Sequence, residues 1–144
     1  MTIPELVGTW SLVSFTAKSS AGDERHPHGT NPIGQLIYTA DGHMSVVLSR
    51  SNRPRFAKAD LMGGTPEEIR QAFEGLEAYA GTYEADAARG TVIHHLAVCR
   101  FPNWEGGSQL RHFTLSGDHL LLATPPMTAR GAEWVYTLAW QRKS

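Results

Sequence analysis

The chain is poor in cysteine, in charge of one sign and in long apolar runs. Its 144 residues include a single cysteine, Cys99, so an internal disulfide framework is excluded. The formal net charge is −1, from 13 Lys and Arg against 14 Asp and Glu, which leaves no basic stripe for nucleic acid or an anionic membrane. No apolar run approaches the length of a membrane span. We therefore expect neither a nucleic-acid partner nor a membrane partner.

Signals for export and for common cofactors are missing as well. The N-terminus, Met1-Thr-Ile-Pro-Glu-Leu6, has no basic segment followed by an apolar one, and a lone cysteine fits a reducing compartment. These features predict a cytoplasmic protein. The sequence has no phosphate loop, Rossmann fingerprint or zinc-knuckle spacing, so no cofactor is expected. The length predicts one domain over residues 1–144.

The chain consists mainly of short segments with strand patterning, separated by turn residues. Several neighbouring segments are joined by hairpin signals such as Ala40-Asp41-Gly42 and Gly117-Asp118. Eight short strands connected in this way predict an all-β, eight-stranded antiparallel up-and-down β-barrel. The expected strands cover residues 10–18, 33–39, 43–50, 77–86, 91–101, 108–116, 119–124 and 133–142.

One short helix is predicted between the third and fourth strands. Thr65 is the expected N-cap, Pro66 stands at the first helical position, and Glu68 completes a capping box. Gly75 is the expected end of the helix. Because the helix is short and lies between two strands, we expect it to plug or cover one mouth of the barrel.

Several blocks of sequence carry a family resemblance that runs nearly end to end. The blocks are residues 8–13 (GTWSLV), 36–45 (LIYTADGHMS), 53–56 (RPRF), 64–68 (GTPEE), 79–84 (YAGTYE), 94–95 (HH), 101–104 (FPNW) and 109–112 (QLRH). Together they resemble the lipocalin-like domain family of small, signal-less bacterial and fungal barrels. The resemblance implies a cup that can hold one small ligand. Related barrels in natural-product pathways act as cyclases or isomerases, so it also makes an enzymatic activity a candidate.

The resemblance further implies a structural role for two residues near the chain ends. In lipocalin-type barrels an arginine of the last strand stacks on the tryptophan of the first strand. Here these residues are Arg142 and Trp10, and a cation–π contact of this kind is worth roughly 0.5–2 kcal/mol. We expect the pair to close one end of the barrel rather than to contact ligand.

Hairpin register predicts which side chains face the interior. Placing Asp86 opposite Thr91 turns His94 inward and His95 outward, and puts Val98 inside and Cys99 outside. The polar residues expected inside by the same reasoning are Ser14, Tyr38, Tyr79, Tyr83, His94, Gln109, Arg111 and Tyr136, whereas Phe15 is expected outside. The expected ligand-binding residues are Tyr38, Met44, Tyr79, Tyr83, His94, Gln109, Arg111, Phe113 and Tyr136.

Three functions follow from this interior, and the sequence leaves all three open. The leading hypothesis is binding of a small, largely apolar or aromatic molecule in the cup. The second is a cofactor-free isomerase or cyclase for a small carbonyl-containing, polyketide- or terpenoid-like metabolite, with His94 as general acid or base and Arg111 stabilising an oxyanion. The third is a structural or partner-binding barrel with a filled interior.

Metal binding is not expected, and the oligomeric state is not decided. Adjacent residues of a strand face opposite sides, so His94 and His95 cannot chelate one ion together. The expected partner is a small-molecule ligand. The sequence leaves a homodimer open.

Overall fold

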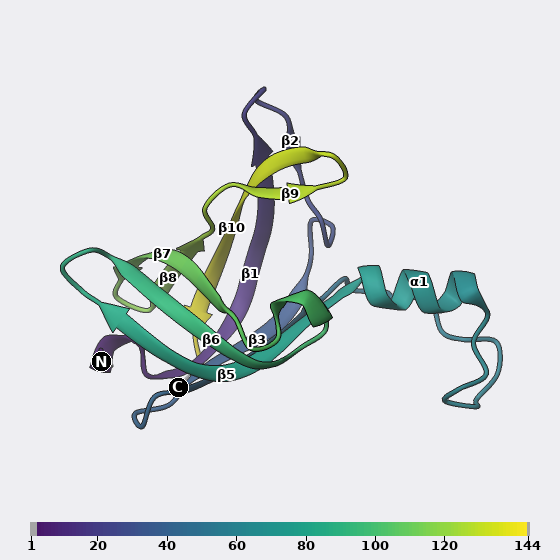
Figure 1. The fold of residues 1–144 in the computed structure, drawn as a ribbon, viewed down its shortest axis with the longest axis horizontal. Helices are drawn as coiled ribbons and strands as arrows, with labels where there is room; N and C mark the ends of the chain where they lie inside the picture. Colours follow the sequence, from purple (N-terminus) through teal and green to yellow (C-terminus); the bar gives the residue numbers. More distant parts are fainter. Residues whose placement is uncertain (1–2, 144) are drawn as a thin grey trace.

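The strands close into an antiparallel barrel, as predicted. The computed structural model describes residues 3–143. Eight strands follow the order β1–β3–β4–β5–β6–β7–β8–β10, and pairing of β1 with β10 closes the ring (Figure 1). Two short strands flank it, β2 beside β1 and β9 beside β10. The bounds are β1 (Gly8–Ser19), β2 (Glu24–Arg25), β3 (Ile33–Tyr38), β4 (His43–Ser49), β5 (Leu76–Asp86), β6 (Thr91–Cys99), β7 (Ser108–Ser116), β8 (His119–Ala123), β9 (Met127–Ala129) and β10 (Ala132–Arg142).

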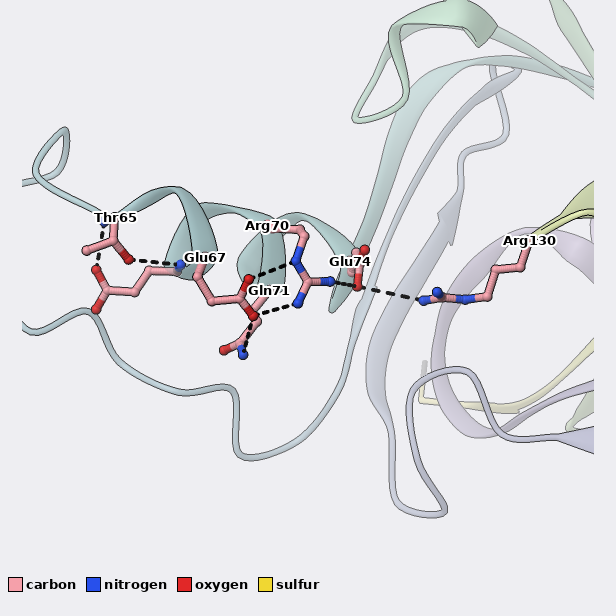
Figure 2. Close-up of polar contacts among 7 residues, drawn as sticks. Thr65, Glu67, Arg70, Gln71, Glu74 and Arg130 are labelled. Carbon is pink, nitrogen blue, oxygen red and sulfur yellow. Dashed lines mark hydrogen bonds and ion pairs between the residues drawn. The ribbon is translucent and has the colours of Figure 1, made fainter.

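The described residues also form three short helices, η1 (Pro4–Leu6), α1 (Pro66–Glu74) and η2 (Pro102–Trp104). Helix α1 lies between the third and fourth barrel strands and begins at the expected capping box, in which the Thr65 and Glu68 side chains bond each other's backbone N–H (Figure 2). Gly75 is its C-cap. In the part of the chain that the structure describes, no helix is long and apolar enough to cross a bilayer.

The direction of α1 differs from the expectation that it covers a mouth of the barrel. The helix projects away from the barrel, and none of its residues is buried (Figure 1). On its surface Arg70 bridges Glu67 and Glu74 (Figure 2), and in its first turn Glu68 accepts a hydrogen bond from the Ala57 backbone N–H of the preceding loop. Only the last turn reaches the barrel, where the Arg100 guanidinium lies 3.9 Å from the centre of the Phe73 ring.

A bulge in β1 reverses the facing predicted for its second half. Leu12 pairs with Trp140 and Ser14 with Ala139, so Val13 has no opposite residue and is 55% exposed. One extra residue exchanges the inward-facing and outward-facing positions in the rest of the strand. Phe15 therefore faces the interior, and the expectation that Ser14 does so is wrong.

A second bulge, between β5 and β6, exchanges two further residues. Ala80 pairs with Val98 but Gly81 pairs with Leu96, which leaves the intervening residue of β6 unpaired. Cys99 is consequently buried and Val98 is 56% exposed, the reverse of the prediction. A Cβ atom on Gly81 would lie only 1.8 Å from the His95 carbonyl oxygen, so this close approach of two backbones requires glycine.

One end of the barrel is sealed by side chains; we call it the closed end and define it by Leu6, Trp10 and Arg142. The Trp10 ring is fully buried, and its Nε1–H donates to the Leu6 carbonyl oxygen at 3.0 Å. The Arg142 guanidinium lies 4.2 Å from the Trp10 ring centre and donates to the Val7 carbonyl oxygen at 2.8 Å. Each polar group of the Trp10–Arg142 pair thus has a partner within the chain.

Candidate ligand-binding site

The other end is open and leads to a cavity of about 400 Å³. Its lining includes residues of the loop after β2, of β9 and of the last turn of α1. This volume lies within the range of small-molecule sites, so side chains do not fill the barrel. Each of the eight barrel strands contributes to the wall, through Phe15, Leu36, Val46, Leu48, Tyr79, His94, Arg111, Leu122, Tyr136, Leu138 and Trp140.

Three buried polar side chains, Tyr38, His94 and Tyr79, form a hydrogen-bonded row, and the last two of them line the cavity. His94 is 1% exposed; its Nε2 lies 2.6 Å from the Tyr38 hydroxyl and its Nδ1 lies 2.7 Å from the Tyr79 hydroxyl. A neutral imidazole has one donor and one acceptor, so one tyrosine donates to the ring and the other accepts from it. Burial, followed by the charges of Arg111 and His95, lowers the pKa of His94 to about 3. The ring is therefore neutral at pH 7, and both of its nitrogens are occupied.

Three charged residues line the cavity, and Arg111 differs from the other two, Arg100 and Glu77, which form an ion pair with each other at 2.9 Å. Arg111 comes from β7, is 6% exposed, and donates from Nη1 to the Leu110 carbonyl oxygen at 2.9 Å. Within residues 3–143 no carboxylate lies within 4 Å of its guanidinium. Burial raises the pKa of Tyr79, and the neighbouring charge of Arg111 opposes that rise. Because a guanidinium has five donors and cannot lose its charge, Arg111 presents unused donors beside the cavity.

Three buried polar atoms in residues that line the cavity have no hydrogen-bond partner among the described residues: His28 Nδ1, Arg100 Nε and Trp140 Nε1. Leaving such an atom unpaired costs about 1–3 kcal/mol, so buried polar groups nearly always have partners. All three residues border the cavity, and His28 also borders a second hollow beside it. The sequence pattern singled out neither His28, which lies outside the expected strands, nor Arg100, which lies near the end of the strand expected over residues 91–101.

The expected ligand-binding residues fall into three groups. Tyr79, His94, Arg111 and Tyr136 line the cavity. Tyr38, Met44 and Tyr83 are buried but do not line the cavity. The β3–β4 hairpin carries Tyr38 and Met44 toward the closed end, where Tyr38 pairs with Gly8 of β1, and Tyr83 of β5 packs against Tyr38 with ring centres 4.5 Å apart. Two residues of β7, Gln109 and Phe113, are half-buried and do not line the cavity.

The second histidine of the pair lies on the outer surface. His95 is placed between Glu84 and Ser108, at 2.7 Å from each. It is thus separated from His94 by the sheet. Across residues 3–143, no three His, Cys, Asp or Glu side chains are arranged to hold a metal ion.

Comparison with known proteins yields a family and a relative. A sequence model of the lipocalin-like domain matches residues 7–143, nearly the whole chain. The 4'-hydroxy-3'-methoxypropiophenone carrier protein ppsC of Aspergillus oryzae is 30% identical over 106 residues, which cover 69% of this chain and 96% of that protein.

Proposed function

We propose that this chain, which belongs to the lipocalin-like domain family, binds a small, largely apolar or aromatic molecule in its barrel cavity. The observation that carries the proposal is the cavity of about 400 Å³ with apolar walls and buried donors that lack acceptors. An apolar wall with a few fixed polar groups is the usual composition of a small-molecule site. The similarity to a protein named as a carrier supports the same reading.

The polar groups of the wall specify the ligand further. Arg111 and the Trp140 indole N–H are donors, so the ligand should carry an acceptor such as a carbonyl or phenol oxygen. The related carrier is named for 4'-hydroxy-3'-methoxypropiophenone, an aromatic ketone with a phenol group. An aromatic or apolar body with a carbonyl oxygen is therefore the ligand class that we propose for this chain.

The surroundings of His94 favour binding over proton-transfer catalysis. A general base at neutral pH needs a free lone pair and a pKa near 7. Both ring nitrogens of His94 are bonded to tyrosine hydroxyls, and burial lowers its pKa to about 3. In our proposal His94 is a positioning residue that fixes the Tyr79 hydroxyl at the cavity wall.

Titration of tryptophan fluorescence tests the proposal, because Trp104 and Trp140 line the cavity. Two neutral probes are used, 4'-hydroxy-3'-methoxypropiophenone and N-phenyl-1-naphthylamine, and we expect saturable 1:1 binding of at least one, with a dissociation constant of about 1–50 μM. Replacement of Leu138 by Trp fills the cavity and should weaken binding by about 10-fold or more. Val135→Trp is the matched control, because Val135 lies on the outer face of the same strand.

Circular dichroism shows whether each variant is folded. If Leu138→Trp does not fold, Leu122→Phe provides a smaller obstruction of the cavity from β8, the strand that pairs with β10. Folded wild-type protein that binds neither probe, or equal affinities in the Leu138 and Val135 variants, would overturn the proposal.

A further inference from the structure

A second hollow lies beside the open end and is lined by four arginines. Its volume is about 660 Å³, and we call it the basic mouth, defined by Arg25, Arg50, Arg53 and Arg130. It shares four lining residues with the inner cavity, so the two spaces are adjacent; they are Pro27, His28, Ala129 and Tyr136. The clustering is local, because the whole chain has a formal net charge of −1.

The charge of the basic mouth is not balanced by the carboxylates of residues 3–143. Glu74 is the one carboxylate among its lining residues, and that group is already 2.8 Å from Arg70, which stands on α1 outside the hollow (Figure 2). Arg130 reaches Glu74 only at 3.7 Å. Within residues 3–143 the other three arginines have no carboxylate within 4 Å; Arg53 and Arg25 donate instead to backbone carbonyl oxygens.

The positive field extends to the boundary between the two spaces. His28 lies on that boundary, is 6% exposed, and has no partner for its Nδ1 atom among the described residues. Burial lowers its pKa to about 4, and the charges of Arg50, Arg100 and Arg53 contribute to the lowering. A buried neutral imidazole thus lies at the boundary between the two spaces, within the field of these arginines.

We infer that the basic mouth binds an anionic group, such as a carboxylate, sulfate or phosphate, carried by the molecule whose apolar body fills the inner cavity. Guanidinium groups bind these anions through charge and paired hydrogen bonds, and an anion would relieve their mutual repulsion. The inference rests on the proposed function and narrows the ligand class to an amphipathic anion. It also assigns an orientation, with the apolar end inward and the charge at the open end.

A pair of fluorescent probes tests this inference. 8-Anilinonaphthalene-1-sulfonate and N-phenyl-1-naphthylamine share one ring system, and only the first carries a sulfonate. We expect the sulfonate probe to bind the wild-type protein about 10-fold more tightly at low salt, because charge attraction adds to apolar burial. The double variant Arg50→Gln/Arg130→Gln should remove about 10-fold of the sulfonate affinity and change the neutral probe by less than about 2-fold.

Arg89→Gln is the matched control, since it removes one positive charge from an exposed turn between β5 and β6, outside the basic mouth. It should leave both probes unchanged. Sodium sulfate should also weaken the sulfonate probe more than sodium chloride does at equal ionic strength, because sulfate competes for the site whereas both salts screen charge.

The outcomes separate the two proposals. If the neutral probe binds and the sulfonate probe binds no more tightly, or if the arginine variant has no effect, anion binding at the basic mouth is contradicted. The proposed function is then unaffected. Equal effects of sulfate and chloride overturn a localised site as well. Arginine-dependent binding of the sulfonate probe without binding of the neutral one supports the basic mouth and counts against the apolar cavity as the main site.

Discussion

The Trp and Arg side chains at the closed end of the barrel and those along the cavity differ in their hydrogen-bond partners. At the closed end the indole of Trp10 and the guanidinium of Arg142 both bond backbone carbonyl oxygens of the N-terminal segment. In the cavity wall the Trp140 indole N–H, one inward position from Arg142 on β10, has no partner among the described residues, and within residues 3–143 no carboxylate lies within 4 Å of the Arg111 guanidinium. The same two residue types therefore stabilise the fold at the closed end and lack such partners along the cavity.

Removal of Trp10 should have the largest effect on stability. Trp10→Ala deletes a fully buried ring together with its hydrogen bond and its contact with Arg142, so we expect a loss of about 3–5 kcal/mol in the free energy of unfolding. Urea unfolding followed by circular dichroism measures it. Trp104→Ala at the open end should lose no more than about half as much, because that ring is only half-buried. Equal losses would contradict the division between the ends.

Acid should destabilise the protein through His94, which lies between the two ends. The folded pKa of His94 is about 3, well below the 6.5 of an unfolded histidine, so the unfolded state binds more protons between these values. Stability therefore falls as the pH drops from 6.5, by up to about 1.4 kcal/mol per pH unit for this residue. Urea unfolding at pH 6.5, 5.5 and 4.5 measures the slope.

His94→Gln provides the comparison, because its amide can still donate to one tyrosine and accept from the other. The variant should lose less stability per pH unit than the wild type over the same range. Identical slopes in the two proteins would mean that His94 is not held neutral in the fold.

After Trp10→Ala, Arg142→Met should cause the next largest loss of stability at the closed end. It removes the cation–π contact with Trp10 and the hydrogen bond to the Val7 carbonyl oxygen, and we expect a loss of about 1–3 kcal/mol. Methionine keeps most of the apolar stem, so the loss reports the guanidinium. If urea unfolding showed a change below about 0.5 kcal/mol, the role of Arg142 in closing the barrel would be contradicted.

Where the hairpins are regular, the sequence was sufficient to predict which side chains face the interior. The Gly117-Asp118 turn fixes the pairing of Phe113 with Leu122, and β7 has no bulge between that pair and Arg111, so the inward facing of Arg111 could be predicted. The capping box likewise fixes the start of α1. Its direction could not be predicted, because it depends on which surface the last turn contacts.

The errors in facing have one physical cause, a single extra residue in a strand. Nothing in the composition of β1 marks Val13 as a bulge, yet the bulge turns Phe15 into the cavity. In β5 the isolated Gly81 does hint at a close backbone approach, and it indicates the bulge that exchanges Val98 and Cys99. The basic mouth could not be predicted at all, since its arginines come from segments that only the closed barrel brings together.

The smallest effect on stability is expected at Arg111, and it gives the sharpest test of the comparison. Arg111 is as buried as a core residue, and within residues 3–143 it has no carboxylate beside it, so the cost of burying its charge offsets the contacts that it makes. Arg111→Met should therefore change the free energy of unfolding by less than about 1 kcal/mol. It should nevertheless weaken binding of a carbonyl-bearing probe by about 10-fold, because a charged hydrogen bond to the ligand is lost. Arg142→Met should show the reverse, with stability reduced and affinity retained, because its guanidinium contacts only the closed end. If both variants lost stability alone, Arg111 would belong to the scaffold and the open end would hold no reserved donor.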